Sequence, residues 1–312
     1  MNLVFFGSSL FAIPTLDKIR LSNHRVLAVV TVEDTKKGRH LKVESDVVKQ
    51  LADRHQILVL QPDDLKKSQF LKNLSDLRAD LFVVVSYGKI LPKQVLDIPP
   101  AGSINLHPSL LPQYRGASPV QKALLDGCKE TGVSVSMVTK ELDSGDILKQ
   151  TRVTVKMSED APALFDRLSK LGADLVLDAV NDIESGKVVR KPQDTKVASY
   201  AHKFKKQDGL IVWEKKAEEI INHVRAMKPW PGTYVQFKGK QLKITKAQLG
   251  EKSEKLKASP GQIVAVCKNQ SISIQTSKGV VELIEVQLEG KKSVNAYDFT
   301  LGQRLTLGDV LL

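Results

Sequence analysis

Short apolar runs alternate with helical patterns through residues 1–190, and this alternation constrains the fold more than any other feature of the sequence. Parallel strands need a long crossover between them, usually a helix. The pattern therefore predicts an α/β fold with a doubly wound, mostly parallel sheet covered by helices. Its strands are expected at residues 3–6, 26–32, 57–60, 81–85 and 103–106.

The segments between these strands carry apolar residues at helical spacing. The first predicted helix presents Leu10, Ile13, Leu16 and Ile19. Further helices are expected at residues 47–54, 65–77 and 161–183. Residues 133–138 and 147–155 alternate between apolar and polar with period two, which predicts an antiparallel pair that closes the sheet.

The pattern changes in the last third of the chain. The lysine-rich stretch around Pro192 predicts a linker at residues 189–206, after a first domain at 1–188. Residues 207–312 then predict an OB-like β-barrel domain that opens with a helix at 213–227. Its short strands are expected at residues 233–237, 241–246, 262–266, 271–275 and 280–287.

Charge is distributed unevenly between these two regions. Of 47 Lys and Arg against 35 Asp and Glu, residues 191–312 hold 21 against 12, a local net charge of +9. A basic module joined to a nearly neutral one suggests a polyanionic partner such as nucleic acid. The alternative is a generally lysine-rich surface without such a partner.

Several protein classes are not expected. No apolar run approaches the ~18 residues of a membrane span, and the N-terminal apolar run is interrupted at Gly7, unlike a signal peptide. Cys128 and Cys267 cannot form a disulfide framework or, alone, a zinc site. We therefore expect a cytoplasmic protein that is not bound to a membrane.

The densest cluster of chemically useful residues lies at 103–119, where a predicted strand ends. Asn105 and His107 are two residues apart and so project from one side of that strand. Open α/β sheets bind ligands beyond the carboxyl ends of their strands. Asn can donate to a developing oxyanion and His can exchange a proton near neutral pH. The simpler reading is a turn-capping Asn and a surface His.

Two further segments have both a functional and an ordinary interpretation. In the turn at residues 141–146, Asp143 or Asp146 could orient His107 through its opposite charge, or the turn could be an ordinary Asp-rich hairpin. The cationic loop at residues 36–40 could bind RNA, although such runs are usually just solvated.

Sequence strings in both halves of the chain match known motifs. The string from Asn105 to Ala117, followed by Leu142-Asp143-x-Gly145-Asp146, resembles the signature of folate-dependent formyltransferases. Tyr200-Ala201-x-Lys203 and the string from Val224 to Gly232 are similar to the C-terminal domain of a narrower family, so that essentially the whole chain resembles the methionyl-tRNA formyltransferase family. The sequence departs from the family pattern at Ser8-Ser9, where Thr-Pro is common, and at residues 33–42, which lack the usual prolines and second glycine.

The resemblance implies specific roles for matching residues. It implies a catalytic trio of Asn105, His107 and Asp143, with Asp143 either orienting His107 or relaying a proton. It implies a tetrahydrofolate-binding loop formed by Ser109, Leu110, Leu111 and Pro112. Arg39 matches a loop arginine that contacts tRNA, and we add the linker lysines as tRNA-binding candidates: Lys203, Lys205 and Lys206.

The implied activity is transfer of the formyl group of 10-formyltetrahydrofolate to the α-amino group of methionyl initiator tRNA, by a monomer and without a metal. One alternative is another folate enzyme, either a formyltetrahydrofolate hydrolase or a sugar-amine formyltransferase. A second is a noncatalytic RNA-binding protein on the same scaffold. The basic second half argues against the first alternative, and the intact trio argues against the second.

Overall fold

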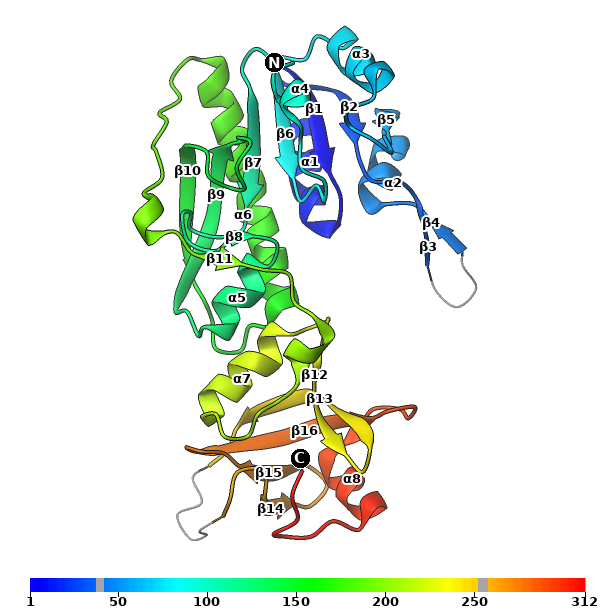
Figure 1. The fold of residues 1–312 in the computed structure, drawn as a ribbon, viewed down its shortest axis with the longest axis vertical. Helices are drawn as coiled ribbons and strands as arrows, with labels where there is room; N and C mark the ends of the chain where they lie inside the picture. The colour runs from blue at the N-terminus through cyan, green and yellow to red at the C-terminus, as the bar shows by residue number, and fades with distance from the viewer. Residues whose placement is uncertain (38–41, 252–257, 312) are drawn as a thin grey trace. The chain divides into compact units, whose positions relative to one another are not determined.

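The computed structural model describes residues 1–37, 42–251 and 258–311 of the chain (Figure 1). Its internal contacts divide the chain into two compact units, and the second includes two short segments that interrupt the first in the sequence. The first unit comprises Met1–Pro119, Glu130–Thr154 and Leu164–Ala201. The second unit comprises Val120–Lys129, Val155–Ala163 and His202–Leu312. The domain limits at 188 and 207 remain predictions.

The first unit is built on a seven-stranded sheet in the order β10-β9-β7-β6-β1-β2-β5. Its strands are β1 Asn2–Gly7, β2 Arg25–Val30, β5 Leu58–Leu60, β6 Leu81–Val85, β7 Ser103–His107, β9 Glu130–Met137 and β10 Ile147–Thr154. Strands β1, β2, β5, β6 and β7 run parallel, whereas β9 and β10 are antiparallel additions. This confirms the predicted doubly wound, mostly parallel sheet and its closing pair.

The strand order reverses direction between β1 and β6. From β1 the chain builds outward through β2 and β5, and it then returns to the other side of β1 to add β6 and β7. Every residue of β6 is buried, as expected for a parallel strand covered on both faces. The reversal makes the carboxyl ends of these strands the expected position of a ligand site.

Helices follow the strands along the chain; the apolar spacing predicted four of them, but not the two short helices at residues 93–96 and 119–125. They are α1 Ile13–Arg20, α2 Val47–Arg54, α3 Ser68–Asp76, α4 Lys93–Leu96, α5 Pro119–Leu125 and α6 Ala161–Glu184. The first predicted helix is wrong at its start, because Leu10–Ala12 forms a 3-10 turn and Leu10 is 70% exposed. Pro14 lies in the first turn of α1, where its fixed φ favours a helix start. None of the described helices is long and apolar enough to span a membrane.

Two stretches expected to be irregular contain paired backbone. Lys36 and Lys37 belong to β3 Thr35–Lys37, which pairs with β4 Lys42–Glu44, so the first two residues of the predicted cationic loop lie in a strand. Pairing satisfies backbone groups that a long loop would leave to solvent. Within the predicted linker, β11 Tyr200–Ala201 pairs with β8 Arg115–Gly116 of the first unit.

The second unit contains a six-stranded antiparallel sheet, which confirms an antiparallel β domain, while its closure into an OB-like barrel stays a prediction. The order is β12-β13-β16-β15-β14, and β17 pairs with β16. Its strands are β12 Thr233–Phe237, β13 Lys240–Leu249, β14 Ile263–Cys267, β15 Ser271–Gln275, β16 Val280–Leu288 and β17 Val294–Asn295. Alternate side chains of these strands form a mainly aliphatic core with α7 Ala217–Ala226 and α8 Ala296–Gln303.

Both helices of this core differ from the prediction. Helix α7 begins at Ala217 rather than at Trp213, and the Trp213 side chain, 4% exposed, packs into the core instead. The Glu219 carboxylate accepts the Lys216 N–H at 3.0 Å and so caps the helix at this point. Helix α8 was not predicted, although Asn295 caps it by accepting the Tyr297 N–H at 2.8 Å.

Candidate active site

Strand β7 positions two of the predicted catalytic residues at its carboxyl end. Asn105 and His107 lie between the parallel strand β6 and the antiparallel strand β9. Asn105 is partly buried, and His107 is only 4% exposed. The two side chains share one side of the strand because they are two residues apart.

The Asp143 carboxylate joins these two side chains from the turn between β9 and β10. Its Oδ1 accepts a hydrogen bond from Asn105 Nδ2 at 3.3 Å, and its Oδ2 lies 3.6 Å from His107 Nδ1. The Gly116 N–H donates to the same Oδ2 at 2.8 Å. The structure therefore brings the predicted trio together, and of the two candidate carboxylates Asp143 is the one beside His107.

The second nitrogen of His107 fixes its tautomer. His107 Nε2 lies 2.9 Å from the backbone carbonyl oxygen of Tyr114. A carbonyl oxygen can only accept, so Nε2 carries the hydrogen and Nδ1 faces Asp143. A proton added at Nδ1 would place an imidazolium against a carboxylate. A proton on this side of the ring would therefore lie at Nδ1, beside the Asp143 carboxylate.

The loop at Ser109–Pro112 is held by side chains of β9 and β10. Ser134 Oγ donates to the Ser109 carbonyl at 2.6 Å and accepts the Leu111 N–H at 3.1 Å. Gln150 Nε2 donates to the Leu111 carbonyl at 2.8 Å. Ser109 and Leu111 are buried, whereas Leu110 and Pro112 are partly exposed. The loop is therefore a fixed surface with two partly exposed apolar side chains.

Sequence reasoning missed the groups that hold the site. The Gly116 N–H and the Tyr114 carbonyl are backbone groups. Nearly every residue has the same groups, so no sequence pattern indicates them. Ser134 and Gln150 were part of the predicted strands, but no signal indicated a contact with the loop. The period-two pattern gives only the face on which each side chain lies.

The predicted tRNA-binding residues are separate from this cluster in the sequence. Lys203, Lys205 and Lys206 belong to the second unit, and all three are exposed. Arg39 lies outside the described residues. Exposed ammonium groups are suited to phosphate contacts.

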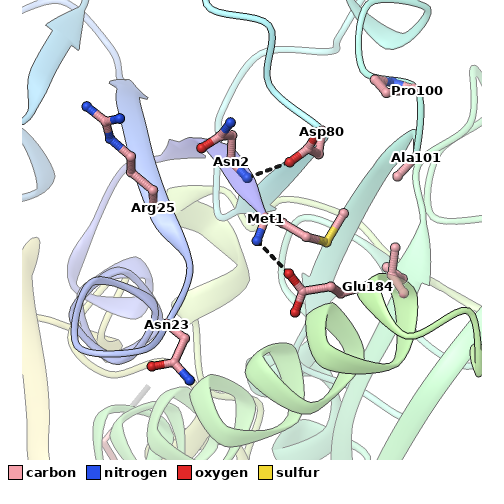
Figure 2. A pocket seen from close by; sticks show the side chains of 9 residues that line it. Met1, Asn2, Asn23, Arg25, Asp80, Pro100, Ala101 and Glu184 are labelled. Atoms are coloured by element: carbon pink, nitrogen blue, oxygen red, sulfur yellow. Dashed lines mark hydrogen bonds and ion pairs between the residues drawn. The ribbon is translucent and has the colours of Figure 1, made fainter.

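A pocket of about 770 Å³ lies at the opposite edge of the sheet, beside the amino ends of β1, β2 and β6. Figure 2 shows its charged groups, among them Arg25, Asp80 and Glu184. The Glu184 carboxylate accepts from the Met1 ammonium at 2.7 Å, and Asp80 accepts the Asn2 N–H at 2.6 Å. These contacts tie the start of β1 to its neighbours, and the predicted trio does not line this pocket. Among the described residues, no group of three His, Cys, Asp or Glu side chains is placed to hold a metal ion.

Comparison with known proteins gives a match along the chain. The formyl transferase family matches residues 1–180, and the formyl transferase C-terminal domain family matches residues 203–304. The methionyl-tRNA formyltransferase of Halothermothrix orenii is 40% identical over 317 residues, covering 100% of both chains. That of Syntrophus aciditrophicus is 42% identical over 311 residues, covering 100% of this chain and 99% of its own.

A solved structure shares the fold. It is HypX from Aquifex aeolicus in complex with tetrahydrofolic acid, with a TM-score of 0.63 and 17% identity. The alignment covers 97% of this chain but only 47% of HypX, so this chain spans about half the length of that protein.

Proposed function

The chain belongs to the formyl transferase family, and from this membership we propose that it transfers a formyl group from 10-formyltetrahydrofolate to the α-amino group of methionyl initiator tRNA. The observation that carries the proposal is the match, over essentially whole lengths, to relatives named methionyl-tRNA formyltransferase. The hydrolase, sugar-amine and noncatalytic alternatives have no comparable support. The product serves translation initiation.

Asn105 and His107 stabilise charge during the transfer. As the neutral amine of methionine attacks the formyl carbon, negative charge develops on the formyl oxygen. The bond between that carbon and the folate nitrogen then breaks, the amine loses one proton, and the leaving nitrogen gains one. Asn105 Nδ2 carries two hydrogens and gives one to Asp143, so the other is available to that oxygen. A proton at His107 Nδ1 supplies a second donor. Fixed donors of this kind lower the barrier because they need no reorganisation.

Asp143 holds both donors. Its carboxylate orients the Asn105 amide and lies 3.6 Å from His107 Nδ1, where its opposite charge stabilises an imidazolium. Alternatively, it accepts the proton of the attacking amine through a water molecule. The two roles of Asp143 differ in the movement of a proton. When Asp143 only orients the donors it takes up no proton, whereas in the second role the proton of the amine passes to Asp143.

10-Formyltetrahydrofolate supplies the formyl group when it is bound. The loop of Ser109, Leu110, Leu111 and Pro112 fits a flat, partly apolar ligand, because its backbone is already hydrogen-bonded and Leu110 and Pro112 are only partly buried. Such a fixed surface avoids much of the entropic cost of ordering a loop on binding. We assign no metal to the reaction.

The second unit would bind the tRNA. The net charge of +9 in residues 191–312, of which residues 202–312 belong to this unit, favours a polyanion, and Lys203, Lys205 and Lys206 offer exposed phosphate contacts. Arg39 is assigned to the same partner by its place in the sequence. We propose that the enzyme acts as a monomer in the cytoplasm, and gel filtration at assay concentration tests the monomer.

Transfer of labelled formyl to four acceptors tests the proposed function. Charged initiator tRNA, glycinamide ribonucleotide, an amino-sugar nucleotide and water are offered separately with 10-formyltetrahydrofolate. We expect label on the tRNA at a rate far above the other three. Rapid formate release without an amine acceptor would instead indicate a hydrolase, and label on the sugar a sugar-amine enzyme.

A further inference from the structure

We infer that Gln193 is a positioning residue for Asp143, an inference that rests on the proposed function. Gln193 lies in the stretch predicted to be a linker, 50 residues after Asp143. Its Nε2 donates to the carbonyl oxygens of Asp143 at 2.9 Å and Gly145 at 2.7 Å. Both hydrogens of the side-chain amide are therefore directed at the turn that carries the carboxylate.

The other end of the same amide holds a buried arginine. Gln193 Oε1 accepts from Arg115 Nε at 3.1 Å and from Arg115 Nη2 at 2.7 Å. Arg115 is 4% exposed, and a buried guanidinium is costly without acceptors. One glutamine thus donates twice to one segment and accepts twice from another, which neither Glu nor Met can do.

The two segments that Gln193 joins are connected by a further hydrogen bond. The strand with Arg115 supplies its donor, and the turn with Asp143 supplies its acceptor. Gly116, directly after Arg115, donates its N–H to Asp143 Oδ2 at 2.8 Å. The strand that holds Gly116 is further fixed where the Arg115 N–H donates to the Ser199 carbonyl at 2.8 Å. Gln193 therefore fixes the donor and the acceptor of this bond relative to each other.

The backbone of the turn explains why it needs such support. Asp143 has a φ of +48°, in the left-handed region that a residue with a side chain adopts infrequently. At Gly145 an added Cβ would lie 2.0 Å from the Met137 carbonyl oxygen, so the turn also packs too tightly for a larger residue. Hydrogen bonds to the carbonyls of both residues hold this conformation and so aim the carboxylate at Asn105 and His107.

The folate loop is held mainly by side chains other than Gln193, so the effect of Gln193 should fall chiefly on catalysis. Ser134 and Gln150 hydrogen-bond Ser109 and Leu111, and the Pro112 carbonyl accepts from the Ser199 N–H at 3.2 Å. Displacing a catalytic group by about 1 Å can cost 10²-fold in rate. Loss of the Gln193 amide should therefore lower kcat and leave the KM for folate and for tRNA nearly unchanged.

The test is a double-mutant cycle between Gln193→Glu and Asp143→Asn. The first substitution keeps the size of the side chain but removes both donors. We expect kcat to fall by about 10- to 100-fold, with each KM within about twofold of wild type. If Gln193 acts through Asp143, adding Gln193→Glu to Asp143→Asn should change kcat by less than about threefold.

Controls separate this effect from charge and folding. Gln94→Glu makes the same change on the exposed face of α4 and should leave kcat unaltered. If Gln193→Glu does not fold, as judged by thermal unfolding, the cycle is repeated with Gln193→Met, which also lacks both donors.

Wild-type kcat in folded Gln193 variants would contradict a positioning role, and so would a raised KM with unchanged kcat. The role would also be excluded if the fold-losses in kcat from the Gln193 and Asp143→Asn substitutions multiply in the double variant. Failure of the proposed function is recognised independently, because wild-type enzyme would then not formylate tRNA. The cycle would in that case be measured with the formyl acceptor that the wild type does use.

Discussion

The two units differ in where their candidate functional polar groups lie: these groups are buried in the first unit and exposed in the second. In the first unit, His107, Ser109, Arg115 and Ser134 are buried at one edge of the sheet and held by hydrogen bonds. In the second unit, the core is mainly aliphatic and the candidate phosphate-binding lysines are exposed. Chemistry on one carbonyl needs donors at fixed positions, whereas attraction of a polyanion depends mainly on net charge. The first unit should therefore be sensitive to single substitutions and the second tolerant of them.

The largest effect is expected in the first unit. Removing one donor to a developing oxyanion typically costs about 10²–10³ in kcat, and we expect this for Asn105→Ala. Asp143→Asn should be at least as severe, because the neutral amide loses the charge beside His107 and keeps only one acceptor oxygen for the Asn105 and Gly116 donors. Single-turnover formyl transfer measures both. The tRNA Kd should stay constant, and an Asp143→Asn enzyme with near wild-type turnover would remove this residue from the mechanism.

Neutralising the exposed lysines tests the other side of the comparison. The test replaces Lys203, Lys205 and Lys206 by Gln in one triple variant. The slope of log Kd for tRNA against the logarithm of salt concentration should decrease by about 1 for each lysine–phosphate contact that is lost. Affinity should fall at low salt, because fewer counterions are released on binding. At saturating tRNA, kcat should be close to wild type. An unchanged slope would show that these lysines are surface charge only.

A milder effect is expected where a buried hydroxyl supports the folate loop. Ser134→Ala leaves the Leu111 N–H and the Ser109 carbonyl short of a partner, at a cost of about 1–3 kcal/mol. The Kd for folate should rise by roughly tenfold, with little change in tRNA binding. Ser136→Ala is the matched control, because the Ser136 hydroxyl is buried on the same strand and has no hydrogen-bond partner among the described residues. Equal effects of both variants would contradict a specific role for Ser134.

The smallest effect concerns stability of the second unit and its pH dependence. Burial lowers the pKa of His223 below 6.5, partly offset by the hydrogen bond between Nε2 and the Asp208 carbonyl at 2.6 Å. The unfolded chain therefore binds this proton more readily than the folded chain does. The stabilising effect is complete above about pH 6.5 and is lost as the pH falls towards the folded-state pKa.

Thermal unfolding of the second unit tests this sign. Its two tryptophans, Trp213 and Trp230, are the only ones in the sequence, so tryptophan fluorescence reports on this unit alone. Between pH 7.5 and 5.5 we expect Tm to fall by a few degrees, at about 4 °C per kcal/mol. The fall should be smaller in His223→Gln, whose amide can still donate to Asp208. An equal fall in both proteins would exclude His223 as the source.

The sequence by itself determined the features that depend on neighbouring residues. The bounds of α2, β6, β12 and β15 were predicted to the residue, since periodicity and burial act over a few positions. The placement of Asn105 and His107 on one side of a strand end follows from their spacing alone. The antiparallel second domain and the uneven charge are likewise visible without a structure.

Only the tertiary structure decided which groups complete the site. Asp143 reaches Asn105 across 38 residues and Gln193 reaches Asp143 across 50, and such contacts depend on strand order rather than on local pattern. The Gly116 N–H and the Tyr114 carbonyl carry no sequence signature, because nearly every residue has the same backbone groups. Gln193 was missed because composition indicated a linker. Composition records how polar a segment is, but the partner of each polar group is fixed only when distant segments pack together.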